Sequence, residues 1–311
     1  MTLAPFVRIV ARGAGRARSL TLPEAQDAMG VILSGKAAPE AVGALLMVLR
    51  LRGETAQEIA GFTAALRAHV SGHIPPADLD WPSYAAGRSR GAPLFLLAAR
   101  LVAQAGFRVS MHGWNSHQAT SASVRDAIDL AGPQVRYDPL ETLCPAAFDL
   151  LNLRDTFGLR SCINTVLRMW NPSKAPVSVQ GVFHPSYRGL QTRAAELLGQ
   201  RDLAVIKGGG GEFERHPSKD IAVFGLRHGR PLSETAPACL ENTRRLHDIN
   251  RPVDARALWF GSLADPFAVA TVTGTAGLAL RALDAAPTQS DADNMACALW
   301  AARHSSESRT A

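Results

Sequence analysis

A glycine-rich run is the segment of this 311-residue chain whose residue types most directly suggest chemistry. It reads Lys207, then four glycines at 208–211, then Glu212. Backbone N–H groups of successive glycines can close around a phosphate group, and a lysine adds positive charge beside them. A flexible turn after a strand would also use such glycines. The sequence leaves both interpretations open.

Two other segments carry side chains that could contact a phosphate group or a nucleic-acid base. Arg88 and Arg90 lie on a short polar loop, where they predict either phosphate binding or simple surface exposure. Tyr84, just before them, could stack on a nucleic-acid base or pack in the core. His112 follows an expected strand, a position where functional residues collect in α/β proteins, and it could equally be a structural hydrogen-bond hub.

The composition favours an anionic partner. The net charge is +6 and the isoelectric point is about 9.5. Arginine supplies most of this charge, because the only lysines are Lys36, Lys174, Lys207 and Lys219. Nucleic acid and phosphorylated small molecules both fit this balance. An arginine-biased composition with a solvated surface would also produce it.

The spacing of the cysteines and the apolar residues argues against several other classes of protein. The four cysteines lie far apart with no C-x-x-C pair, so the sequence predicts neither disulfides nor structural zinc, and it favours the reducing cytoplasm. No apolar run reaches the ~18 residues that a membrane span requires. Paired carboxylates with acid/base spacing, a His/Cys metal cluster and a G-x-S-x-G motif are all missing from the sequence.

Hydrophobic periodicity predicts two domains. Residues 1–75 have the pattern of short amphipathic helices, with capping boxes at Thr21–Glu24 and Thr55–Glu58. Residues 76–311 alternate strands with helices, which predicts an α/β domain with a mostly parallel sheet, onto which the C-terminal helices could pack. The strands are expected at 107–111, 177–183, 203–207 and 221–226, and a helix among others at 121–131.

Two stretches resemble glycosyltransferase family 3, which includes anthranilate phosphoribosyltransferase and the pyrimidine-nucleoside phosphorylases. The first contains L-R-L-R-G-E-T at 49–55 and E-I-A-G-F at 58–62. The second, from Arg154 through F-G-L-R-S at 157–161 to Asn171-Pro172, is similar to the transferases' R-x-x-L-G-x-R-T-x-x-N … N-P segment. The resemblance implies a small N-terminal helical bundle joined to a larger α/β domain.

The resemblance also implies a donor site that this chain has altered. The family's G-T-G-G-D loop for phosphoribosyl pyrophosphate corresponds to residues 83–91, where the aspartate is gone and two arginines have appeared. The K-H-G-N-R motif corresponds to residues 111–115, which keep His112 but lose both basic residues. The acidic pair that holds magnesium is reduced to Glu212, so magnesium is expected only if transferase activity survives. Arg154 matches the family's position for the aromatic acid.

These departures resemble a divergent branch of the family that binds nucleic acid through a basic groove. The leading prediction is a cytoplasmic homodimer, paired through its N-terminal helices, that binds single-stranded or non-specific nucleic acid. The alternative is a glycosyl or phosphoribosyl transferase of unknown acceptor that uses phosphoribosyl pyrophosphate, and a third possibility is an inactive scaffold. No catalytic residue is assigned. The residues expected to bind phosphate or nucleic acid are Tyr84, Arg88, Arg90, His112, Asn115, Ser116, Arg154, Arg168, Lys207, Arg215 and Lys219.

Overall fold

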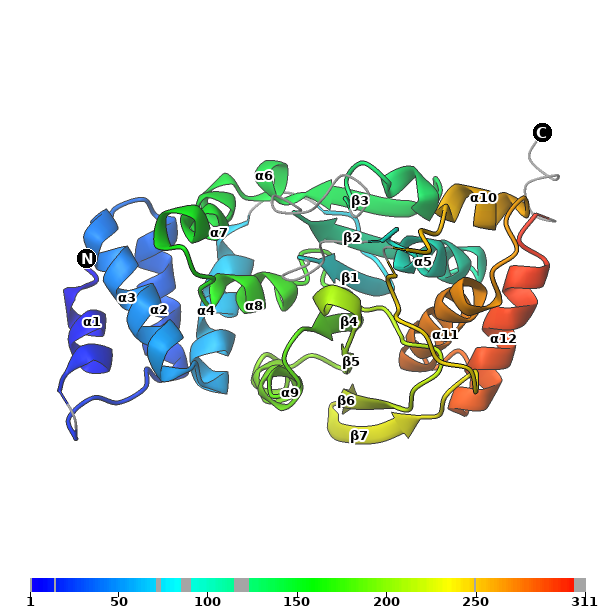
Figure 1. Cartoon of the computed structure of the whole chain (residues 1–311). Coiled ribbons are helices and arrows are strands. Elements are labelled where there is room, and N and C mark those ends of the chain that lie inside the picture. Colours follow the sequence, from blue (N-terminus) through cyan, green and yellow to red (C-terminus); the bar gives the residue numbers. More distant parts are fainter. Residues whose placement is uncertain are drawn as a thin grey trace.

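A computed structural model gives the fold of the chain and describes residues 2–13, 15–70, 74–84, 91–114, 123–248 and 250–304. The N-terminal helices form one end of the molecule, a sheet runs through the middle, and the last helices form the other end (Figure 1). This architecture confirms the expected helical bundle joined to an α/β domain. Within the described residues, none of the helices has both the length and the apolar composition needed to cross a membrane.

The bundle begins with four short helices, α1 (Ala4–Ala11), α2 (Leu22–Leu33), α3 (Pro39–Arg52) and α4 (Ala56–His69). Both expected capping boxes are present at the starts of α2 and α4. The fully buried Glu58 also accepts the backbone N–H of Leu20 at 2.9 Å, which joins α4 to the segment before α2. The two helices touch at Gly61, where a Cβ atom would lie 2.3 Å from the carbonyl oxygen of Leu22.

Three helices from the middle of the chain complete the bundle, namely α6 (Leu140–Leu143), α7 (Pro145–Phe157) and α8 (Ile163–Arg168). Their buried apolar side chains, such as Leu151 and Val166, share one core with Leu45 and Phe62 of α3 and α4. The helical unit therefore comes from two separate parts of the chain. The expected boundary near residue 75 stays a prediction, as does dimerisation through the N-terminal helices.

The sheet has seven strands in the order β3-β2-β1-β4-β5-β6-β7. Their bounds are β1 Leu79–Ser83, β2 Val109–Gly113, β3 Val135–Pro139, β4 Val177–Val182, β5 Asp202–Lys207, β6 Ile221–Arg227 and β7 Arg230–Ala236. The first five strands in this order, β3, β2, β1, β4 and β5, are parallel to one another. Strand β6 pairs antiparallel with β5, and β7 pairs antiparallel with β6. The strand order reverses between β1 and β4, and ligands of open α/β sheets bind at the carboxyl ends of strands at such a reversal.

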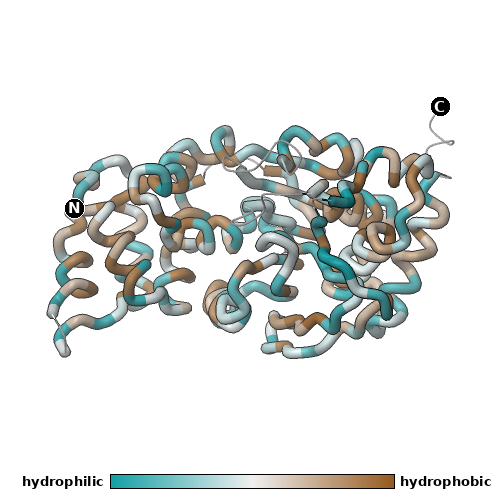
Figure 2. The backbone as a smooth tube through the Cα atoms, viewed as in Figure 1, coloured by the Kyte–Doolittle hydropathy of each residue, from teal (hydrophilic) through white to brown (hydrophobic). Residues whose placement is uncertain are grey.

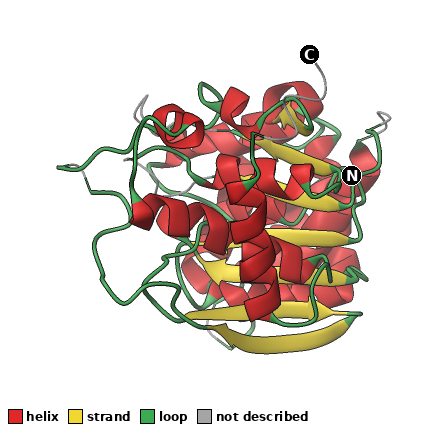
Figure 3. Ribbon diagram, turned by 90° about the vertical axis from the view of Figure 1, so that its right-hand side faces the viewer, coloured by secondary structure: helices red, strands yellow, loops and turns green. Residues whose placement is uncertain are grey.

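Helices pack around the sheet (Figure 3). In β5, alternate residues belong to different cores: Ala204 and Ile206 face one core, and Leu203 and Val205 face the other, as the two-residue period of a strand requires. The first core includes α5 (Phe95–Gln104), α10 (Ala255–Phe260), α11 (Pro266–Ala282) and α12 (Gln289–Ala301). The second lies beneath α9 (Tyr187–Leu197) and the bundle. The segment between β7 and α10 is mostly hydrophilic (Figure 2).

The structure differs from the sequence-based expectation in several elements. Strands β1, β3 and β7 were not expected, and the described part of the helix expected at 121–131 contains only a short 3-10 turn, η2 (Ile128–Ala131). Strand β1 reads L-D-W-P-S and buries all five residues, including polar Asp80 and Ser83. Such a strand lacks both the apolar run and the alternation that mark strands in a sequence, and it contains a proline.

Candidate functional site

The candidate site lies at the edge where the parallel strands end. The last residues of β1, β2, β4 and β5 are Ser83, Gly113, Val182 and Lys207. Residues 85–90, which follow β1 in the sequence, and residues 115–122, which follow β2, lie outside the described residues. Four of the expected site residues fall in these two segments, so their roles stay predictions: Arg88, Arg90, Asn115 and Ser116.

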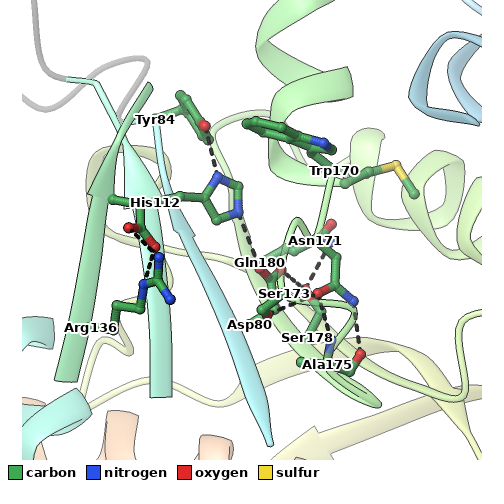
Figure 4. Close-up of polar contacts among 12 residues, drawn as sticks. Asp80, Tyr84, His112, Arg136, Trp170, Asn171, Ser173, Ala175, Ser178 and Gln180 are labelled. Atoms are coloured by element: carbon green, nitrogen blue, oxygen red, sulfur yellow. Dashed lines mark hydrogen bonds and ion pairs between the residues drawn. The ribbon is translucent and has the colours of Figure 1, made fainter. Parts of the chain in front are cut away.

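A buried chain of hydrogen bonds links the ends of β1 and β2 (Figure 4). The Tyr84 hydroxyl lies 2.8 Å from Nδ1 of His112, and Nε2 of the same ring lies 3.1 Å from Oδ1 of Asp80. The hydroxyl of Ser178 on β4 donates to the other oxygen of Asp80 at 2.8 Å. In the tautomer whose Nε2–H donates to Asp80, Nδ1 can accept the Tyr84 proton.

Burial assigns Tyr84 and His112 to the interior. Tyr84 is 2% exposed, and burial raises the pKa of its hydroxyl well above the ordinary value. The His112 ring is enclosed between Tyr84 and Trp170, with ring centroids 5.4 and 5.7 Å away. The Tyr84 ring is therefore packed in the core, and the His112 ring bonds both Tyr84 and Asp80, while a binding role for either residue stays a prediction. In this conformation Tyr84 cannot stack on a base.

Replacing Tyr84 by phenylalanine is expected to lower the free energy of unfolding by about 1–3 kcal/mol, because the buried Nδ1 of His112 would lose its partner. Urea denaturation followed by tryptophan fluorescence measures the loss. Tyr137 is the matched control, since its hydroxyl makes only a 3.4 Å bond to the Gly113 carbonyl, and Tyr137→Phe should cost less. Equal losses in the two variants would contradict the role of the buried chain.

Glu212 and Arg168 are both buried beside this chain of hydrogen bonds. The Glu212 carboxylate accepts the Ser83 hydroxyl at 3.1 Å, and Arg168 donates to the Tyr84 carbonyl at 3.1 Å. Burial lowers the pKa of Arg168, while the charge of Glu212 opposes that shift. Nowhere in the described residues do three His, Cys, Asp or Glu side chains gather as a metal-ligand set. The described residues around Glu212 therefore do not by themselves supply the several hard oxygen ligands that a magnesium ion requires.

Glu214 occupies the start of helix α5. Its Oε2 accepts the backbone N–H of Phe95 at 3.1 Å, and its Oε1 lies 2.5 Å from Nε2 of His247. The first N–H groups of a helix have no partner within the helix and commonly bind anions. Here the chain supplies that anion itself. The His247 ring also lies directly over Gly91, where a Cβ atom would be 2.3 Å from Nδ1.

An arginine-lined pocket lies between the bundle and the end of β4. Its volume is about 80 Å³, and its polar lining comes from Arg50, Arg160, Ser161, Asn164, Thr165, Arg168, His184 and Tyr187. Burial lowers the pKa of Arg160 to about 10, and the charges of Arg154, Arg168 and Arg50 add to that shift. Among the described residues, no acidic side chain forms an ion pair with Arg50, Arg154 or Arg160. Like charges held together in this way favour the binding of an anion.

The remaining expected site residues separate into two groups. Lys207 and Lys219 are exposed and line one cleft, next to the glycine run. Arg215, by contrast, is 0% exposed and pairs with Asp293 of α12 at 2.9 Å. The prediction that Arg215 contacts nucleic acid is therefore corrected: its guanidinium group points into the protein and is already bonded.

The sequence-based prediction missed several residues of these sites. Arg50 and Arg160 stand in the two stretches that carried the family resemblance, so the signal for them was present. Glu214 follows Glu212 by two residues, and an E-x-E pair after a glycine run could have drawn attention to it. His247 had no such signal, because it lies on an irregular segment far along the chain.

Comparisons with known proteins agree with this fold. A model of the helical bundle domain of the glycosyl transferase family matches residues 5–70. The anthranilate phosphoribosyltransferase of Caldivirga maquilingensis is 30% identical over 242 residues, which cover 72% of this chain and 68% of that protein. The enzyme of the same name from Chromobacterium violaceum is 27% identical over 66% of this chain, and the match spans only 65% of its length. An uncharacterized protein of Aquifex aeolicus is 26% identical over 75% of this chain and 77% of its own.

Solved structures show the same fold at lower identity. Anthranilate phosphoribosyltransferase from Thermus thermophilus has a TM-score of 0.73 and 23% identity, over 91% of this chain and 92% of that chain. The Saccharomyces cerevisiae enzyme, in complex with PRPP and Mg, has a TM-score of 0.74 and 15% identity, over 97% and 95% of the two chains. The similarity therefore extends to the α/β domain as well as the bundle.

Proposed function

Because this chain belongs to glycosyl transferase family 3, as an anthranilate phosphoribosyltransferase-like member, we propose that it transfers a pentosyl or phosphoribosyl group to an acceptor with a carboxylate or a similar anionic group. The observation that carries this proposal is the arginine pocket beside the β1–β4 reversal. Its position, at the carboxyl ends of the strands and against the bundle, is where an α/β fold of this type binds ligands.

The acceptor would be held by guanidinium groups. A guanidinium group presents paired N–H donors that match the two oxygens of a carboxylate, and such charge-assisted bonds are stronger than neutral ones. Arg160 and Arg50 are free of ion pairs with described residues, so both can turn toward an acceptor. Asn164 adds an amide to the same pocket. Several relatives are named for anthranilate, which is itself an aromatic carboxylate.

The buried groups of the site would position the pocket rather than react. Arg168 lines the pocket and also bonds the Tyr84 carbonyl, so it connects the acceptor side to the Tyr84–His112–Asp80 chain. That chain holds the ends of β1 and β2 in place.

Nucleic-acid binding receives less support from the described residues. Arg168 and Arg215 are buried, and the Tyr84 ring is packed against His112. A polyanion would need exposed cations along a continuous path. The relatives compared above that have assigned names are phosphoribosyltransferases. The transferase alternative is therefore the function that we propose.

Isothermal titration with anthranilate and other aromatic carboxylates, in the presence and absence of phosphoribosyl pyrophosphate, tests the pocket. We expect Arg160→Ala to weaken carboxylate binding by roughly 10- to 100-fold, which is the effect of losing one or two charge-assisted hydrogen bonds. Arg193→Ala, on the exposed side of α9, is the control and should bind like the wild type. Equal affinities in the two variants, or no saturable binding to the wild type, would contradict the proposal.

A further inference from the structure

Two of the four cysteines are exposed, and they lie on different segments of the chain. Cys239 comes three residues after the end of β7, and Cys297 lies in α12, whereas Cys144 and Cys162 are buried. All four thiols are free in the structure. Because Cys239 and Cys297 are far apart in the sequence, their ability to react together depends on how the segment after β7 packs against α12.

Helices α11 and α12 lie side by side at the end of the molecule opposite the bundle (Figure 1). Only the short segment 283–288 joins them, so they run in opposite directions. A Cβ atom on Gly277 of α11 would lie 2.1 Å from Oδ1 and 3.1 Å from Cα of Asp293 of α12, which sets their register. Gly274 comes one turn before Gly277, and Cys297 comes one turn after Asp293. Cys297 and Gly274 therefore lie at the same level of the helix pair.

The sulfur atom of Cys239 contacts α11 at this same level. A Cβ atom on Gly274 would lie 3.3 Å from Sγ of Cys239. Since glycine has no side chain, the thiol can lie close to the helix backbone there. The backbone N–H of Cys239 donates to the Pro217 carbonyl at 2.6 Å, which holds the residue in this position. The packing thus brings both exposed cysteines to the Gly274 turn of α11.

Arg215 places the two cysteines on the same flank of the helix pair. Its guanidinium group donates to the Pro237 carbonyl and, at 2.9 Å, to the Asp293 carboxylate. Pro237 lies two residues before Cys239. Asp293 lies four residues before Cys297, and side chains with this spacing share one face of a helix. A single buried side chain therefore bonds both segments that carry the exposed thiols.

The electrostatics of Cys239 also place the second thiol nearby. The sulfur of Cys239 is partly buried against α11, and this burial raises the pKa of the thiol. The positive charge of Arg215 opposes the shift, whereas the negative charges of Asp293 and Cys297 add to it. Such an effect weakens with distance, so the contribution of Cys297 agrees with the packing. Because the thiolate is the reactive form, the raised pKa disfavours Cys239 as the thiol that reacts first.

We propose that Cys239 and Cys297 form a reversible disulfide bond when the protein meets a low-molecular-weight disulfide such as oxidised glutathione. The Cys297 thiolate attacks one sulfur of the glutathione disulfide, forms a mixed disulfide and releases one glutathione thiolate. The Cys239 thiolate then attacks the sulfur of Cys297, closes the protein disulfide and releases the second glutathione. The two protein protons end on the two released thiols, and the glutathione disulfide takes up the two electrons. Neither cysteine lines the arginine pocket, so this inference does not rest on the proposed transfer reaction.

Mass spectrometry of the full chain after treatment with oxidised glutathione tests the pair. We expect the wild type to lose two hydrogen atoms and to yield a cross-linked peptide that contains Cys239 and Cys297, while Cys144 and Cys162 stay reduced. Cys239→Ser should instead retain one glutathione on Cys297, because the second step has no nucleophile. Glutathione on both exposed cysteines of the wild type without a cross-link, or a cross-link between two chains, would overturn the proposal.

A second readout is the melting temperature before and after the same treatment. A disulfide constrains the unfolded chain, so the oxidised wild type should melt roughly 5 °C above the reduced protein. Cys239→Ser is the matched control, and its melting temperature should not rise, because no loop is closed. Excess dithiothreitol should return the wild type to its starting value. A melting temperature that oxidation leaves unchanged or lowers would overturn the placement of the two sulfur atoms within bonding reach in the native fold.

Discussion

Arg215→Ala is expected to lower the free energy of unfolding by about 3–5 kcal/mol, because breaking a buried ion pair leaves the partner charge uncompensated. The guanidinium group of Arg215 bonds both carboxylate oxygens of Asp293, at 2.9 and 3.1 Å, and the carbonyls of Gly274 and Pro237. It therefore joins the segment after the glycine run to α11, α12 and the end of β7. The Asp293 side chain is 24% exposed, so water can partly solvate its charge, and we expect the loss of unfolding free energy to lie in the lower half of this range.

Urea denaturation of three variants tests this prediction. Arg215→Ala is compared with Arg227→Ala, whose partner Glu234 is partly exposed, so that this pair should contribute at most about 1 kcal/mol. Arg215→Met keeps most of the buried volume, and we expect it to lose less than the alanine variant. If Arg215→Ala cost no more than Arg227→Ala, the buried pair would not be what holds these segments together.

Arg215 also illustrates what the sequence could not predict. Its charge and its position after the glycine run are visible in the sequence, and from these a phosphate contact was expected. Its partner Asp293 lies 78 residues further along the chain, so the pairing depends on how α12 packs. Burial of a charged residue follows from long-range packing, and local patterns do not encode it.

The helices could be predicted because their signals are local. The capping boxes before α2 and α4 lie within four residues, and the apolar spacing that follows them repeats every turn. Strands β1, β3 and β7 lacked such signals. Edge strand β7 consists mostly of exposed and part-buried residues. Strand β1 buries Asp80 only because His112 and Ser178, from the two neighbouring strands, form hydrogen bonds with it. The reason for that burial lies in strands that are distant in sequence.

Like the secondary structure, the candidate site could be predicted only in part. The glycine run, Lys207 and Lys219 were recognised from residue types, and the structure brings them to one cleft. Arg50 and Arg160 lie in the stretches that carried the family resemblance, but local patterns could not predict that they meet. They come from α3 and the segment before α8, which come together only when the two parts of the bundle pack. The capping of α5 by Glu214 likewise depends on tertiary contacts between segments 119 residues apart.

Gly181→Ala is expected to destabilise the protein by about 3 kcal/mol, at the upper end of the range for overpacking. Gly181 lies in β4, and a Cβ atom there would be 2.0 Å from the carbonyl carbon of Glu212 and 2.4 Å from the backbone nitrogen of Phe213. Both neighbours are backbone atoms, which cannot rotate away as a flexible side chain would. The segment 212–214 must shift, and the carboxylates of Glu212 and Glu214 would move from Ser83 and the start of α5.

The same substitution at Gly30 provides a control with the opposite sign. Gly30 is exposed in the middle of α2, and a Cβ atom added there would meet nothing within 4 Å, so Gly30→Ala should stabilise the protein by roughly 0.4–1 kcal/mol. Urea denaturation measures both changes. A Gly181→Ala variant with wild-type stability would mean that the segment 212–214 can shift without loss of packing, which would contradict this prediction.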